Sequence, residues 1–247
     1  MSLLEVRGVC KEFSDEFSLK DISFEIDTKG VYGFLGKNDS GKSALALVLA
    51  GAIEADSGSI VYKENKLYAS QKQTALIKKK IGFAPQRCVF DTDMTAFEVL
   101  DFTGTAKGVE TDKRYRQIKE ALEITGLSDK DTCLVKELTL SEKKRLSIAN
   151  ALLGNPEVVI LDEPLRYLDP SQAEEIRSII AMLGKKKVVL IFSANAGDIQ
   201  SLCTHTAILA GGQIVLWASI EAILEKLREN GFDGLGAALD AFSGEVE

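Results

Sequence analysis

A glycine-rich loop between two apolar segments constrains this chain more than any other feature. Residues Gly36 to Ser43 read GKNDSGKS, an unbroken GxxxxGKS pattern, after the apolar run Val31–Leu35 and before the alanine- and leucine-rich segment Ala44–Ala50. This order predicts a strand, a phosphate-binding loop and the start of a helix. Glycines let backbone N–H groups converge on phosphate oxygens, and the N-terminus of the new helix adds a positive dipole. The alternative, a chance glycine-rich turn, is disfavoured because both flanking patterns are in place.

Two side chains of this loop carry chemistry of their own. Lys42 is expected to reach the β- and γ-phosphates of a nucleoside triphosphate, and the Ser43 hydroxyl is expected to bind Mg²⁺. We therefore predict a nucleotide site made of consecutive loop residues: Gly36, Lys37, Asn38, Asp39, Ser40, Gly41, Lys42, Ser43 and Ala44.

Two carboxylates end an apolar run much later in the chain. Residues Val158–Leu161 are all apolar, a pattern typical of a buried parallel strand, and Asp162 and Glu163 follow directly. In open α/β sheets, ligands gather at this end of a strand. We expect Asp162 to hold Mg²⁺, directly or through water, and Glu163 to polarise an attacking water, which typically contributes about 10²–10⁴-fold to a rate. A solvated acidic turn is the alternative, and the phosphate loop makes it the weaker one.

The composition disfavours several other classes of protein. The chain has 247 residues, of which 45% are hydrophobic and 27% charged, as in a folded protein with a substantial core. The net charge of −7 does not favour a nucleic-acid partner. The lysine runs at 78–80 and 185–187 are interpreted as solvated ends of secondary structure, with a phosphate-backbone patch as the less favoured alternative.

Cysteine usage and hydropathy bear on location. The four cysteines lie far apart and the chain has one histidine, so a zinc site or a disulfide framework is disfavoured and a reducing cytosol fits. The N-terminus lacks a signal-peptide pattern, and no apolar run approaches the about 18 residues that span a bilayer. We expect that any membrane process would need a separate membrane-spanning partner.

Hydrophobic patterns along the chain predict an α/β protein without internal repeats. The first strands, with a turn at residues 14–16 between two of them, are expected to form an antiparallel flank beside a nucleotide-binding core, and a helical stretch follows. Strands are expected at 3–9, 19–26, 57–62, 81–84, 158–162, 187–192, 206–210 and 213–217, and helices within 96–154 (111–125 and 141–153 among them), at 171–183, after 193 and, as a pair, at the end of the chain.

The order of these pieces resembles the nucleotide-binding domain of ABC transporters, the ATP-binding cassette family, over residues from about 3 to 220. The phosphate loop matches at each required position, and Leu161-Asp162-Glu163-Pro164 with Leu168-Asp169 is similar to the family's metal strand, catalytic glutamate and D-loop. Lys11-Glu12-Phe13 resembles the segment whose aromatic ring stacks on adenine. Phe83-Ala84-Pro85-Gln86 resembles the Q-loop, whose glutamine senses Mg²⁺ and couples to the transmembrane partner.

The resemblance implies an architecture and partners. It implies a P-loop NTPase of the ABC type over residues 1–220, with a RecA-like core sheet, an antiparallel β flank and a helical subdomain near 87–154, followed by a helical tail at 221–247. Two such domains would enclose two ATP molecules with Mg²⁺ head to tail, on the cytoplasmic face of the membrane beside a separate permease. The tail resembles that of efflux-type systems.

Several positions depart from the family pattern. The LSGGQ signature falls on Leu138-Thr139-Leu140-Ser141-Glu142, so both glycines are lost and Glu142 places an anion where the γ-phosphate of the opposite subunit should dock. A shifted alignment that starts the signature at Leu140 needs a two-residue deletion. The switch histidine corresponds to Asn195, which can hydrogen-bond a phosphate but cannot carry charge.

Two further departures lie within the phosphate loop. Asp39 stands where the family has glycine, and Ala44 where it has a hydroxyl residue. Asp39 would weaken nucleotide binding unless it points to solvent or pairs with Lys37. Together the departures favour a slow or regulatory ATPase over harmless drift. The alternatives that stay open are a non-transport assembly or regulatory module, and a nucleotide-binding pseudoenzyme.

Overall fold

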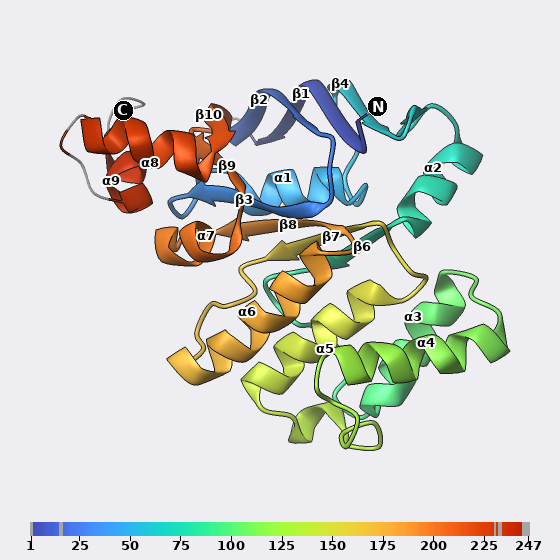
Figure 1. Ribbon diagram of the computed structural model, residues 1–247. Helices are drawn as coiled ribbons and strands as arrows, with labels where there is room; N and C mark the ends of the chain where they lie inside the picture. Colours follow the sequence, from blue (N-terminus) through green and yellow to red (C-terminus); the bar gives the residue numbers. More distant parts are fainter. Residues whose placement is uncertain (1, 15–16, 230, 232–233, 244–247) are drawn as a thin grey trace.

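The chain folds around two β-sheets with helix α1 between them (Figure 1). The computed structural model describes residues 2–14, 17–229, 231 and 234–243. Within these residues the core sheet has six strands in the order β10-β9-β3-β8-β7-β6. All neighbours are parallel except β9 and β10. The bounds are β3 (Gly30–Gly36), β6 (Ile81–Ala84), β7 (Val158–Asp162), β8 (Val188–Ser193), β9 (His205–Ala210) and β10 (Gln213–Ser219).

An antiparallel sheet in the order β2-β1-β4-β5 forms the predicted flank. Its strands are β1 (Leu4–Ser14), β2 (Phe17–Ile26), β4 (Ser57–Tyr62) and β5 (Asn65–Lys66). The described helices are α1 (Lys42–Leu49), α2 (Gln71–Lys79), α3 (Ala96–Ala106), α4 (Thr111–Ile124), α5 (Leu140–Leu152), α6 (Pro170–Gly184), α7 (Ala196–Leu202), α8 (Ile220–Glu229) and α9 (Gly234–Ser243), with a 3₁₀ turn at Val135–Glu137.

Strand β8 explains why the core strands read as unbroken apolar runs. Val188, Leu190 and Phe192 pack into the hydrophobic cluster shared with α1 and the antiparallel sheet. Val189 and Ile191 point to the other face and pack into the cluster shared with the helices below. Both faces of the core sheet are covered, so successive residues must all be apolar.

The parallel arrangement also decides where polar chemistry can gather. The carboxyl ends of β3, β6, β7 and β8 share one edge of the core sheet. These strand ends and the loops that follow them contain the phosphate loop, Gln86, the Asp162–Glu163 pair and Asn195. Residues far apart in sequence are thereby brought to one side of the molecule, as the α/β reading predicted.

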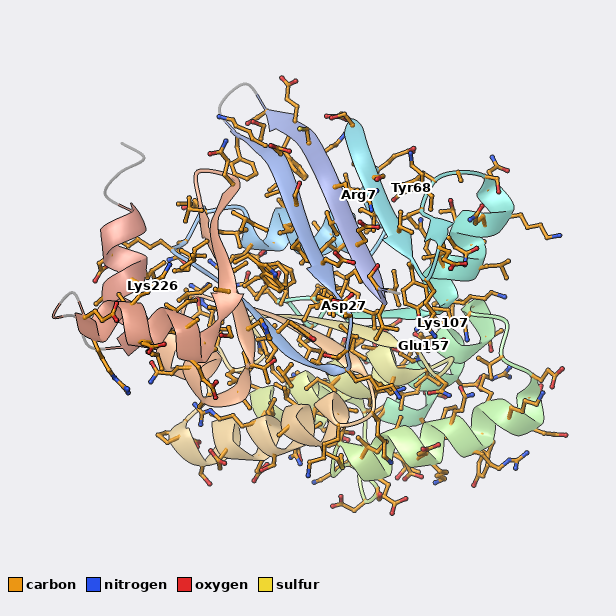
Figure 2. All side chains as sticks on the ribbon, turned by 45° about the horizontal axis from the view of Figure 1, so that its top comes forward. Arg7, Asp27, Tyr68, Lys107, Glu157 and Lys226 are labelled. Carbon is orange, nitrogen blue, oxygen red and sulfur yellow. The ribbon has the colours of Figure 1, made fainter. Side chains whose placement is uncertain are left out.

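Between β6 and β7 the chain forms a helical region of α3, α4, the 3₁₀ turn and α5 (Figure 1). Lys107, labelled in Figure 2, follows the last residue of α3 and donates a hydrogen bond to the Leu153 carbonyl just after α5, at 2.7 Å. Burial lowers the pKa of Lys107 to about 8. This contact joins the C-terminal ends of α3 and α5.

The structure departs from the sequence expectations at several elements, one of which is the two-residue strand β5 that no pattern predicted. Strand β1 continues past Val9 to Ser14, pairing Lys11 with Leu19 and Glu12 with Ser18. The exposed end of β1 lies beyond the core, so hydrophobic alternation is lost there. Residues 15 and 16 of the expected turn lie outside the described residues. Helix α2 was not expected because Ile77 is the one residue of that helix that is fully buried.

No helix in the described ranges has both the length and the apolar character needed to cross a bilayer.

Candidate nucleotide site

A cleft of about 720 Å³ collects residues from several separate segments of the chain. The phosphate loop forms one wall, and Gln86, Glu163 and Arg166 come from the loops after β6 and β7. Ser14 and Phe17, at the facing ends of β1 and β2, also line it. The loop residues that reach the cleft are Asn38, Asp39, Gly41, Lys42, Ser43 and Ala44. The structure therefore brings together the glycine-rich loop and the acidic strand end.

Two glycines of the loop are required by close contacts. Gly41 precedes α1 with φ +103°, and a Cβ there would lie 3.0 Å from Cζ of Phe17. A Cβ on Gly36 would lie 2.3 Å from the Ser40 hydroxyl. Gly36, Lys37 and Ser40 do not line the cleft themselves. They hold the shape of the loop around the residues that do.

Lys42 is buried at the base of the cleft, with 6% of its surface exposed. Its Nζ donates hydrogen bonds to the carbonyls of Gly36 and Lys37, both at 2.7 Å. Burial lowers the pKa of Lys42, and the carboxylates of Glu163 and Asp162 oppose that shift. The ammonium thus lies between the loop and the acidic strand end, where it can meet phosphate oxygens.

The acidic pair at the end of β7 is also buried. Asp162 is 4% exposed and Glu163 is 6% exposed, and burial raises the pKa of both. Glu163 Oε1 accepts a hydrogen bond from the Ala194 amide at 3.0 Å. Its backbone has φ +48°, in the left-handed region that few non-glycine residues adopt. Glu163 therefore lines the cleft from a turn with a left-handed backbone directly after β7.

Lys144 connects the acidic pair to the helical region. It lies on α5, is 5% exposed, and its Nζ donates to the Glu163 carbonyl at 2.6 Å and to the Gln86 carbonyl at 3.4 Å. Burial lowers the pKa of Lys144, while Cys88 and Glu163 oppose that shift. One buried ammonium therefore joins α5, the loop after β6 and the loop after β7.

Comparison with known proteins decides the family. The family model described as ABC transporter matches residues 19–166, more than half of the chain. This chain belongs to the ABC transporter family. It is an ATP-binding ATPase subunit of that family, and we call it the cassette below. The match confirms the fold class and the activity that the motifs predicted.

Individual relatives agree with the assignment. The cassette is 30% identical to the ABC transporter ATP-binding protein YxlF of Bacillus subtilis, over 93% of this chain and 75% of that protein. It is also 30% identical to the Nod factor export ATP-binding protein I of Rhizobium sp., over 90% and 73%. Among solved structures, the dimeric, post-hydrolysis ATP-binding cassette MJ0796 is similar in fold, with a TM-score of 0.78 at 20% identity over 88% of this chain and 98% of that one.

The segment of residues 138–142, on which the signature falls in the motif comparison, forms the capped N-terminus of helix α5. Thr139 is the residue before α5 and accepts a hydrogen bond from the Glu142 amide, while the Glu142 carboxylate accepts from the Thr139 amide at 2.8 Å. Lys130 lies 3.4 Å from the same carboxylate. The charge of Glu142 is thus partly neutralised within its own chain, which the motif comparison did not anticipate. Ser141 is buried, and Leu140 is exposed.

Besides the three loop residues already named, Asp162, Asn195 and Phe13 are predicted site residues that do not line the cleft. Asn195 precedes α7, and its Oδ1 accepts hydrogen bonds from the amides of Gly197 and Asp198. Phe13 does not line the cleft, although its ring lies 5.8 Å from that of Phe17, which does. The roles of Asn195 at phosphate and of Phe13 at adenine stay predictions.

The structure also shows the surroundings of Asp39. Lys37 forms its ion pair with Asp240 of α9, at 3.3 Å, rather than with Asp39. Asp39 is exposed and has φ +66°, which explains why the family places glycine there. Sequence reasoning missed Ser14, Phe17 and Arg166 as cleft residues. Phe17 could have been suspected as the second aromatic of the same hairpin, whereas Arg166 had no pattern to mark it.

Proposed function

We propose that the cassette binds ATP with Mg²⁺ at the cleft and uses slow hydrolysis to drive a separate membrane permease of the export type. The observation that carries the proposal is the cleft where the phosphate loop, Gln86 and Glu163 meet. The export assignment is supported by similarity to the Nod factor export protein. In this proposal the cassette lies on the cytoplasmic face of the membrane.

The residues at the strand end fit a Mg²⁺ ion. Oδ1 of Asp162 is buried and has no hydrogen-bond partner among the described residues, so this acceptor is left for a cation. A hydrogen bond from Ser43 acts on the same carboxyl group. Mg²⁺ commonly takes one or two protein oxygens together with phosphates and water, and when bound it would neutralise phosphate charge. Asp162 and Ser43 would hold the ion, and Gln86, which also lines the cleft, could contribute a further oxygen.

Slow turnover is the first quantitative expectation. Leu140 and Ser141 replace glycines that would approach phosphate closely, and the Asn195 oxygen is already occupied by α7. Loss of one preorganised stabiliser of transition-state charge typically costs about 10²–10³-fold. We expect phosphate release by the purified chain to be well below the usual enzyme median of about 10 s⁻¹. Replacing both Leu140 and Ser141 with glycine should raise the rate; turnover near the median without these changes would contradict the proposal.

A second cassette completes each site in this proposal, as the dimeric cassette similar in fold suggests. The Thr139–Glu142 segment of one cassette would cover the nucleotide held by Lys42, Asp162 and Glu163 of the other. In a homodimer both sites carry every departure, whereas in a heterodimer each site carries only some of them.

The permease is tested by affinity capture of the tagged cassette from solubilised membranes. We expect an integral membrane protein to be retained by the wild-type cassette. Capture of soluble proteins alone would favour a non-transport module and contradict the proposal.

A further inference from the structure

Arg166 brings a second cation into the nucleotide cleft. It is half-buried in the loop between β7 and α6 and lines the cleft together with Lys42, Gln86 and Glu163. This position is three residues after the acidic pair, so the same loop supplies both a carboxylate and a guanidinium to the cleft.

The loop holds Arg166 in place through its backbone. The Arg166 amide donates to the Glu163 carbonyl at 3.3 Å, and Tyr167 has φ +67°. The guanidinium carbon lies 4.9 Å from the centre of the Tyr167 ring, a stacking contact that arginine favours. These contacts restrict the guanidinium without occupying its polar edge.

The charge of Arg166 acts on the reactive groups around it. Burial is the main influence on Glu163 and raises its pKa, whereas Lys42 and Arg166 lower it. Burial likewise dominates at Asp162, where Arg166 again acts in the opposite direction. Arg166 has no salt-bridge partner in the part of the chain that the structure describes. Its N–H donors therefore remain available for a ligand.

We propose that Arg166 contacts the γ-phosphate of bound ATP and supplies positive charge to the transition state from within the same chain. Arginine presents a planar set of N–H donors that matches two oxygens of a phosphate. An arginine provided by the enzyme's own chain is an established way to stabilise phosphoryl transfer. In this cassette Arg166 supplies a positive charge that Asn195, which corresponds to the family's switch histidine, cannot supply. The inference rests on the proposed function, because it requires ATP in this cleft.

The test compares ATP with ADP binding to the purified chain by calorimetry in the presence of EDTA, so that metal binding does not enter. Arg166→Ala should weaken ATP binding by about ten- to a hundred-fold, as expected for a charge-assisted hydrogen bond, and leave ADP binding unchanged. Arg166→Lys should lose less, because it keeps the charge but not the planar donors. Phosphate release with Mg²⁺ should fall by at least about 10²-fold in Arg166→Ala.

Lys185→Ala is the matched control, since it removes one exposed positive charge at the end of α6, outside the cleft. Its ATP-to-ADP affinity ratio should equal that of the wild type. Equal losses for ATP and ADP in Arg166→Ala, or an unchanged ratio with slower hydrolysis, would overturn the contact while leaving the proposed function intact. Wild-type protein that is folded but binds neither nucleotide, in EDTA or with Mg²⁺, would overturn the proposed function itself, and the contact with it.

Discussion

Lys42→Ala is expected to reduce ATP binding below detection, a loss of at least about 10²-fold in affinity. The side chain is buried between the phosphate loop and the acidic strand end, where its ammonium can meet the phosphates. Hydrogen bonds to charged groups contribute about 1.5–3 kcal/mol each, and an ammonium can make several to a triphosphate. Titration calorimetry with ATP and Mg²⁺ measures the loss.

The control for this variant is Lys20→Ala, which removes an exposed lysine from β2. It should bind ATP as the wild type does. The thermal unfolding of both variants should be measured to check that they are folded, because Lys42 also donates hydrogen bonds to the carbonyls of Gly36 and Lys37. Undiminished binding by folded Lys42→Ala protein would show that nucleotide does not occupy this cleft.

Glu163→Gln is expected to slow ATP hydrolysis by about 10²–10⁴-fold while ATP affinity changes little. Glutamine has nearly the same shape and keeps an oxygen to accept the hydrogen bond from the Ala194 amide. It cannot accept a proton from the attacking water. Single-turnover phosphate release and calorimetry separate the loss of chemistry from binding.

Glu157→Gln makes the same chemical change near the opposite end of β7. Glu157 precedes β7, and its carboxylate is ion-paired with Lys63 and Lys80. It does not line the cleft, so hydrolysis should persist. If Glu163→Gln retained the wild-type rate, another residue would have to act as the general base.

Much of the fold follows from local patterns that the sequence displays. The apolar runs before the phosphate loop and before Asp162 became β3 and β7, each within a residue of its expected end. Expected helices at 111–125 and 171–183 became α4 and α6. These elements have strong periodicity because one or both faces are buried, and burial is what a hydrophobic pattern records.

Other parts of the site depend on geometry that a pattern does not record. Arg166 reaches the cleft through a loop in which Glu163 and Tyr167 both have positive φ, although neither is glycine. The Glu142 carboxylate accepts a hydrogen bond from the Thr139 amide, and the Asn195 side-chain oxygen accepts one from the first turn of α7. A motif identifies which residue occupies a position, whereas these contacts depend on the neighbours that folding brings to it.

The hydrogen bonds of Lys144 have a thermodynamic consequence. Its ammonium joins α5 to the carbonyls of Gln86 and Glu163, so a displacement of the helical region must either move the loop after β7 or break these bonds. Coupling of this kind is reciprocal. If ATP binding changes the affinity of a partner protein that contacts Gln86, that partner must change the affinity for ATP by the same factor.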